Sequence, residues 1–266
     1  MNEPPPSRNA PPPSSPAPGR SRRASPGSAA GIVPAYFGPW ANEEWELLVR
    51  LRPAIVVINP ANGPGRAPHG GYRENVDRCR AFGADVLGYV ATGWLRRPID
   101  EVADDVANYG SWYGTSGAFF DEIPNGSARG RLATLARLNA LTGRQRTVFN
   151  CGQPIPLRWY RVFPEVLWGT FEGAPAQLLE TSFLGPALRQ IHLVHSVPSS
   201  ATSTVVAELA RRGVGFSCVT TDEMPNPWDV CPPGDVAECA RRWLVRGVRS
   251  SRQLAENRAG AIGRWA

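Results

Sequence analysis

The amino-acid sequence predicts a single-domain α/β protein with a (β/α)8 barrel of the TIM type, and three observations lead to this fold class. Eight short apolar runs occur along the 266 residues. They are near-continuous rather than alternating, which is typical of strands buried on both faces. Segments with helical spacing separate the runs, and such alternation favours parallel βαβ units. Eight units in roughly 225 residues are close to the ~250 residues typical of this barrel.

The expected strands share a high content of β-branched and aromatic residues. In chain order they cover residues 32–37, 54–59, 86–91, 118–120, 147–149, 166–171, 191–195 and 214–219. A helix before the fifth strand is predicted by the spacing of Leu132, Leu135, Leu138 and Leu141. The alternative fold is an open doubly wound sheet. No Gly-x-Gly-x-x-Gly turn follows a strand, which counts against the nucleotide-binding form of that sheet.

The chain divides into one folded domain and two terminal segments. Residues 1–30 are rich in Pro, Ser, Arg and Ala without an aliphatic run, which predicts a disordered tail. Residues 31–255 form the expected barrel, and residues 256–266 form a C-terminal tail. The first segment lacks the apolar centre of a secretory signal, and no run of about 18 apolar residues predicts a membrane span. These features indicate a cytoplasmic location, or export by a route that the sequence does not reveal.

Charge and composition exclude several partners. Half of the formal net charge of +6 falls within residues 1–30, so the expected barrel is nearly neutral and has no basic stripe for nucleic acid. A nucleic-acid binder acting through the arginine-rich tail is the alternative, and steep salt dependence of binding would identify it. No Cys-x-x-Cys pair or zinc motif is present. We therefore expect a monomer without a metal or other cofactor.

Two of the expected strands end in acidic residues. Residues 117–120 lead into Asp121 and Glu122, and residues 166–171 lead into Glu172. Active sites of parallel barrels lie at the carboxyl ends of the strands, so these acids are expected in one cleft. Paired carboxylates in such a cleft suggest glycosidic-bond chemistry. The alternative roles are helix capping for the first two acids and a salt bridge with arginine for Glu172.

The orientation of the two consecutive acids follows from strand geometry. Neighbouring strand residues point to opposite sides, so Asp121 shares a side with Phe119 and Glu122 shares a side with Phe120. Only one of the two carboxylates is expected inside the barrel, and the sequence leaves open which one. A further acidic pair, Asp222-Glu223, follows the eighth expected strand and is interpreted as solvated loop acids.

Six motifs are similar to those of the spherulin-4-like family, and together they span most of residues 31–220. In order and spacing they are Val33-Pro-Ala-Tyr-Phe37, residues 57–65, residues 87–92, Trp112-Tyr113, Phe119-Phe-Asp-Glu122 and Phe171-Glu172-Gly173. The resemblance implies a barrel of glycoside hydrolase family 135, whose characterised fungal members cut galactosamine-containing exopolysaccharide. It also places the acids of that family on Asp121, Glu122 and Glu172.

Other residues in or near the strand ends suit sugar recognition, because hydroxyl groups need hydrogen-bond partners and sugar ring faces pack on aromatic rings. The candidates for substrate binding are Tyr36, Asn59, Tyr89, Asn150, Trp168 and His195. The alternative role for each aromatic residue is packing in the core. The rigid, turn-rich segment 59–65 is expected to form a shaped rim beside the second strand.

The predicted function is hydrolysis of glycosidic bonds in an amino-sugar polymer, of the endo-α-1,4-N-acetylgalactosaminidase type that the resemblance implies. Asp121 is expected to act as nucleophile or transition-state stabiliser, Glu172 as general acid/base, and Glu122 to orient them. Crowding of the acids should raise one pKa. A variant mechanism lets the N-acetyl oxygen of the sugar attack while Asp121 orients it. The competing class is a non-catalytic carbohydrate-binding or spore-surface structural barrel.

Overall fold

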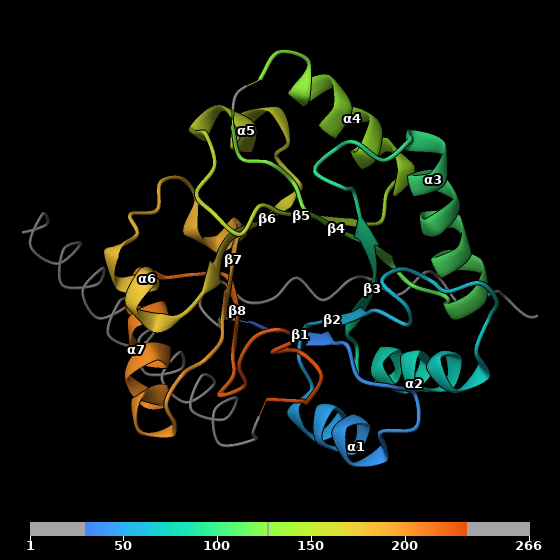
Figure 1. The fold of residues 1–266 in the computed structure, drawn as a ribbon, viewed down its shortest axis with the longest axis horizontal. Coiled ribbons are helices and arrows are strands. Elements are labelled where there is room, and N and C mark those ends of the chain that lie inside the picture. The colour runs from blue at the N-terminus through green and yellow to red at the C-terminus, as the bar shows by residue number, and fades with distance from the viewer. Residues whose placement is uncertain (1–29, 127, 233–266) are drawn as a thin grey trace, which may run out of the picture.

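The computed structural model describes residues 30–126 and 128–232, and these residues form a closed parallel barrel of eight strands. The strands follow one another around the barrel in chain order, β1 to β8, and a ring of helices surrounds them (Figure 1). The predicted (β/α)8 fold is therefore confirmed. Most of the expected N-terminal tail and all of the C-terminal tail lie outside the described residues.

Each predicted strand occurs within two residues of its expected bounds. The strands are β1 (Ala30–Ala35), β2 (Ile55–Ile58), β3 (Asp85–Ala91), β4 (Gly117–Asp121), β5 (Arg146–Asn150), β6 (Leu167–Gly173), β7 (Gln190–Val194) and β8 (Phe216–Val219). The α-helices are α1 (Asn42–Leu51), α2 (Gly70–Ala81), α3 (Ile99–Asn108), α4 (Arg131–Leu141), α5 (Leu157–Val162), α6 (Pro175–Glu180) and α7 (Thr202–Arg212). Short helical turns cover η1 (Tyr109–Tyr113), η2 (Ala187–Arg189) and η3 (Ser199–Ala201). Within the described part of the chain, every helix is too short or too polar to span a membrane.

Alternation of side chains along the strands divides the core into an inner and an outer part. Inward residues such as Ile55, Leu87 and Phe119 fill the barrel. Outward residues such as Val86 and Phe120 pack against the helices. Since Phe119 points inward, Asp121 also lies on the inner side at the end of β4.

A β-bulge interrupts this alternation in β6. Gly169 is opposite Ile191 of β7 and Phe171 is opposite His192, so Thr170 is an extra residue in the pairing. As a result, Phe171 packs outward in a cluster with residues of α6 and α7. Glu172, the next residue, points into the barrel mouth. In a strand without the bulge, with Thr170 included in the pairing, the two side chains would exchange sides.

The outer layer includes one close contact that leads to a stability prediction. A Cβ atom on Gly88 would lie 2.2 Å from the Tyr109 ring, and this ring is buried with its hydroxyl donating to the Ile58 carbonyl. We expect Gly88→Ala to lower the free energy of unfolding by about 1–3 kcal/mol through overpacking. Gly110→Ala is the matched control, since a Cβ there meets no atom within 4 Å. Denaturant unfolding measures both, and equal stabilities would contradict the prediction.

Candidate active site

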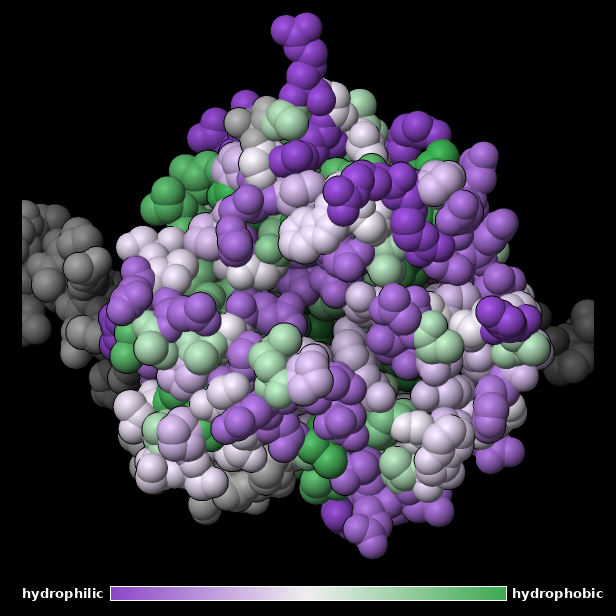
Figure 2. Space-filling model, viewed as in Figure 1, coloured by the Kyte–Doolittle hydropathy of each residue, from purple (hydrophilic) through white to green (hydrophobic). Residues whose placement is uncertain are grey.

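A pocket of about 350 Å³ lies at the carboxyl ends of the strands. Figure 2 shows a hollow near the centre of this face with mainly hydrophilic residues around it. The lining comes from seven strand ends or strand-end loops and from the segment after β8: Tyr36, Asn59, Asn62, Tyr89, Phe119, Asp121, Asn150, Glu172, Leu193, Met224, Pro225, Asn226, Pro227 and Trp228. The pocket therefore contains two of the three predicted acids and four of the six predicted substrate-binding residues.

Asn150 connects the two carboxylates of the pocket. Its side-chain nitrogen donates one hydrogen bond to Asp121 Oδ1 and one to Glu172 Oε2, each 2.8 Å long. The amide oxygen of Asn150 accepts a 3.2 Å hydrogen bond from the Gly152 N–H, which fixes the orientation of the amide. A single side chain thus bonds both carboxylates and helps to position them. Asn150 was predicted as a substrate-binding residue, and its position here is between the two acids.

The space for Asn150 comes from a glycine on the neighbouring strand. A Cβ atom on Gly169 would lie 2.1 Å from Asn150 Oδ1 and 2.9 Å from Asn150 Cγ. The Gly169 carbonyl also accepts hydrogen bonds from the N–H groups of Cys151 and Gly152, at 2.9 and 3.1 Å. Gly169 therefore allows β5 and β6 to approach closely at the level of the carboxylates.

Asp121 has a perturbed pKa. Burial, and next the negative charge of Glu172, raise the pKa of Asp121 from 3.8 to about 6. Hydrogen bonds from the Glu122 backbone, Asn150 and Tyr89 act in the opposite direction. Burial and the charge of Asp121 also raise the pKa values of the Tyr36 and Tyr89 hydroxyls, so both remain protonated and can donate hydrogen bonds.

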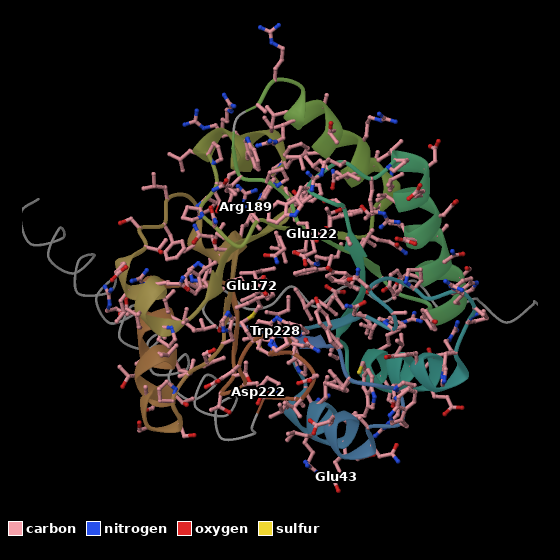
Figure 3. All side chains as sticks on the ribbon, in the orientation of Figure 1. Glu43, Glu122, Glu172, Arg189, Asp222 and Trp228 are labelled. Carbon is pink, nitrogen blue, oxygen red and sulfur yellow. The ribbon has the colours of Figure 1, made fainter. Side chains whose placement is uncertain are left out.

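Glu172 is held through both of its oxygens. Oε2 accepts the bond from Asn150, and Oε1 accepts a 3.2 Å bond from the indole N–H of Trp228. Both partner atoms are N–H donors, and together they fix the orientation of the carboxylate. Glu172 and Trp228 both lie near the middle of this face (Figure 3). Trp228 was not predicted, and the signal that could have indicated it is its place in the segment that follows the last strand.

The loop after β2 forms the predicted rim. Asn59 and Asn62 line the pocket, and the loop folds back on itself through a 3.0 Å bond from the Gly63 N–H to Asn59 Oδ1. Tyr113 of η1 supports the loop from outside by donating a 2.9 Å hydrogen bond to the Pro64 carbonyl. The rigid rim is thus positioned by a helical turn that lies about fifty residues later in the chain.

Three predicted site residues lie outside the pocket lining. Trp168 is fully buried on the outer side of the barrel, where its ring packs against Phe149 and Trp159. Its placement in the substrate site was therefore wrong, because Trp168 occupies an outward position of β6. Glu122 turns away from the pocket to bond the Gly93 N–H. His195 lies beside Trp228, with 6.2 Å between ring centroids.

The acids after β8 were interpreted as loop acids, and they also lie outside the pocket lining. Asp222 lies toward the periphery of the face in Figure 3. Its Oδ2 accepts a 3.3 Å bond from the Thr220 hydroxyl, within its own loop. Glu223 is exposed.

The fold and the pocket together define a (β/α)8-barrel protein with paired carboxylates at the face where barrel enzymes have their active sites. The chain belongs to Spherulation-specific family 4, whose family model matches residues 31–239. Spherulin-4 from Physarum polycephalum is 33% identical over 97 residues, and this match covers 34% of the chain and 29% of that relative. The predicted resemblance to the spherulin-4-like family is therefore confirmed.

Solved structures of sugar-binding barrels show similar folds. Sph3 of Aspergillus clavatus, determined in complex with GalNAc, has a TM-score of 0.69 and 24% identity, covering 82% of this chain and 98% of Sph3. A chitinase domain of Pyrococcus furiosus, complexed with chito-oligosaccharides, has a TM-score of 0.50 and 11% identity. That match covers 85% of this chain and 97% of the chitinase chain. At these identities the likeness concerns the fold.

Proposed function

We propose that this chain is a glycoside hydrolase that cleaves an amino-sugar polymer containing galactosamine or N-acetylgalactosamine. The observation that carries the proposal is the pair of carboxylates, Asp121 and Glu172, bridged by the amide of Asn150 in an open pocket. Most glycoside hydrolases use two such groups, one protonated and one ionised. Tyrosine and asparagine side chains around the pair supply donors and acceptors for sugar hydroxyls.

The choice of sugar rests on the relatives. Sph3 was determined with GalNAc bound, and its fold resembles that of this chain over nearly the whole of Sph3. The similar chitinase was determined with oligosaccharides of another amino sugar. Both support a substrate with 2-amino or 2-acetamido groups, and the α-1,4-linked galactosamine polymer remains the finer proposal.

The roles of the two acids follow from their surroundings. Glu172 was predicted as the general acid/base and Asp121 as the nucleophile or stabiliser. The raised pKa of Asp121 favours the reverse assignment, in which Asp121 gives its proton to the leaving sugar oxygen and Glu172 acts as the nucleophile or stabiliser. Because both carboxylates bond one nitrogen, their nearest oxygens are separated by at most twice 2.8 Å. This closeness favours retention, for which carboxyl groups about 5–5.5 Å apart are typical.

The test is to incubate the purified protein with galactosamine-rich, chitin-type and glucan polymers and to analyse the oligosaccharides released. We expect products from the galactosamine-rich polymer. NMR of the first product shows which anomer forms, and therefore whether configuration is retained. Binding of the polymer without any cleavage would contradict the proposal and would support a carbohydrate-binding barrel.

Hydrolysis is expected to decline above a pH of about 6, because Asp121 then loses the proton that the leaving group needs. Since burial and the charge of Glu172 raise the pKa of Asp121 to about 6, its carboxyl group is protonated below that pH and ionised above it. As Asp121 loses its proton, kcat/KM should fall by about tenfold per pH unit on the alkaline side. The pH profile of kcat/KM measures this limit, and a flat profile across neutral pH would refute the acid role of Asp121.

A further inference from the structure

The loop after β3 begins with a left-handed turn that carries an exposed tryptophan. Gly93, Trp94 and Leu95 have positive φ angles of 59°, 58° and 65°. Residues other than glycine rarely adopt this conformation, so surrounding contacts must hold it. The side chain of Leu95 packs on the outer core, whereas that of Trp94 is 54% exposed.

Glu122 fixes the start of this turn. Its Oε2 atom accepts a 2.8 Å hydrogen bond from the Gly93 N–H, and its own φ of 59° departs from the extended strand that precedes it. The Thr92 hydroxyl donates to the carbonyl oxygens of Asp121 and Glu122, at 2.8 and 3.1 Å. The turn is therefore attached to the end of the strand that carries Asp121.

Arg97 closes the other end of the turn. Its Nη1 atom donates a 2.6 Å bond to the Ala91 carbonyl and a 2.9 Å bond to Asp105 of α3. The Arg97 N–H donates to the Thr92 carbonyl at 3.1 Å. The backbone of the turn is thus anchored on both sides, and the indole of Trp94 projects from a rigid support.

We propose that Trp94 is a stacking platform for a sugar ring of the polymer outside the pocket, and that Glu122 is the positioning residue that holds it. This inference rests on the proposed function and names a binding site beyond the cleavage site. A polymer extends past a pocket of about 350 Å³, so its outer sugars lie over the rim loops. The β3 loop leaves the barrel beside the site, because Ala91 pairs with Asp121 in the β3–β4 register.

The chemistry of the exposed indole matches such an occupant. The less polar face of a pyranose ring packs on a flat aromatic surface, and an indole offers a large one at a small entropic cost. Trp45 and Trp159 pack in the core and are buried, whereas Trp40 and Trp94 are exposed. Trp94 differs from Trp40 in its left-handed backbone conformation. A bulky residue kept exposed in an unfavourable backbone conformation points to a functional reason for its place.

The first experiment compares Trp94→Asn and Trp94→Tyr with the wild type on galactosamine polymer and on its short oligosaccharides. Asparagine tolerates the left-handed conformation, so Trp94→Asn removes the ring without adding strain. We expect its KM for the polymer to rise roughly tenfold, its kcat/KM for the shortest cleaved oligosaccharide to change by less than about twofold, and Trp94→Tyr to restore polymer binding. The same change for short and long substrates would overturn the proposal.

The second experiment tests the support from Glu122. Glu122→Gln keeps an oxygen that accepts from the Gly93 N–H, whereas Glu122→Ala removes it. We expect Glu122→Ala to raise the polymer KM as Trp94→Asn does, and Glu122→Gln to restore it. A loss of kcat on short oligosaccharides in both variants would show that Glu122 takes part in the reaction, and would overturn its positioning role.

A binding measurement separates this inference from the proposed function. Affinity electrophoresis in gels that contain the galactosamine polymer reports the Kd in the Asp121→Asn background, where no cleavage is needed. Weaker retention after the added Trp94→Asn change supports the platform even if the wild type cuts no polymer. Unchanged retention would overturn the platform even if hydrolysis by the wild type is established.

Discussion

Asp121→Asn and Glu172→Gln are each expected to lower kcat on the galactosamine polymer by about 10²–10⁴-fold while the barrel stays folded. Asparagine and glutamine fill the same space and can still accept from Asn150. Neither amide can deliver a proton or stabilise a positively charged sugar as a carboxylate does. Rates of reducing-end release measure the loss, and circular dichroism checks the fold.

The matched control for this pair is Glu223→Gln, which removes an exposed acid of the loop after β8. Its kcat should stay within about twofold of the wild type, because loop acids in water contribute little to a buried reaction.

An azide-rescue experiment distinguishes the roles of the two acids. Azide is expected to rescue a Glu172→Gly variant with a glycosyl azide of inverted configuration, as a lost nucleophile requires. Wild-type rates in both carboxamide variants would refute the assignment of the pair.

Asn150→Ala is expected to lower kcat by about 10²-fold, because it removes the donor that both carboxylates share. Gly169→Ala should have a similar effect from the neighbouring strand, since its Cβ would lie 2.1 Å from Asn150 Oδ1 and displace that side chain. Both variants keep Asp121 and Glu172. A loss of rate would therefore come from the position of the acids and not from their chemistry.

The pH profile distinguishes this positioning role from a general loss of structure. The hydrogen bond from Asn150 lowers the pKa of Asp121, so its removal should raise that pKa further and move the alkaline limit of kcat/KM upward. Asn125→Ala is the control, because the Asn125 amide also makes two hydrogen bonds, to Gln153 and Pro154, away from the pocket. An Asn150→Ala enzyme with wild-type kcat and an unchanged limit would contradict the prediction.

The sequence predicted the barrel and much of the pocket for the same physical reason. Strands buried on both faces must be apolar, so their runs and their ends can be recognised without knowledge of tertiary contacts. Tyr36, Asn59, Tyr89 and Asn150 follow from these ends, because parallel strands bring them to one face. Which of Asp121 and Glu122 faces the interior of the barrel depends on one unknown, the side to which Phe119 points.

The misplaced and missing residues depend on contacts that local sequence does not encode. Trp168 and Glu172 are four residues apart on β6, and regular alternation would put them on the same side. The unpaired Thr170 puts the two side chains on opposite sides of the strand. Threonine is not a turn-forming residue, so its presence at this position does not indicate a bulge. Trp228 contacts Glu172 across 56 residues of sequence, and its loop is tied to β1 by the Tyr36 N–H. Such long-range pairs become visible only in the folded chain.

The bulge in β6 also makes the site depend on how this strand pairs with β7, as well as on the kinds of residue it contains. If Thr170 took a place in the pairing with β7 and the strand alternated regularly, Phe171 would face the interior and Glu172 would face the helices. The pocket would then exchange one of its two charges for an aromatic ring, although every acidic residue of the chain would still be present. The position of one of the two carboxylates is therefore set by a one-residue shift in strand pairing, and not by the order of residue types alone.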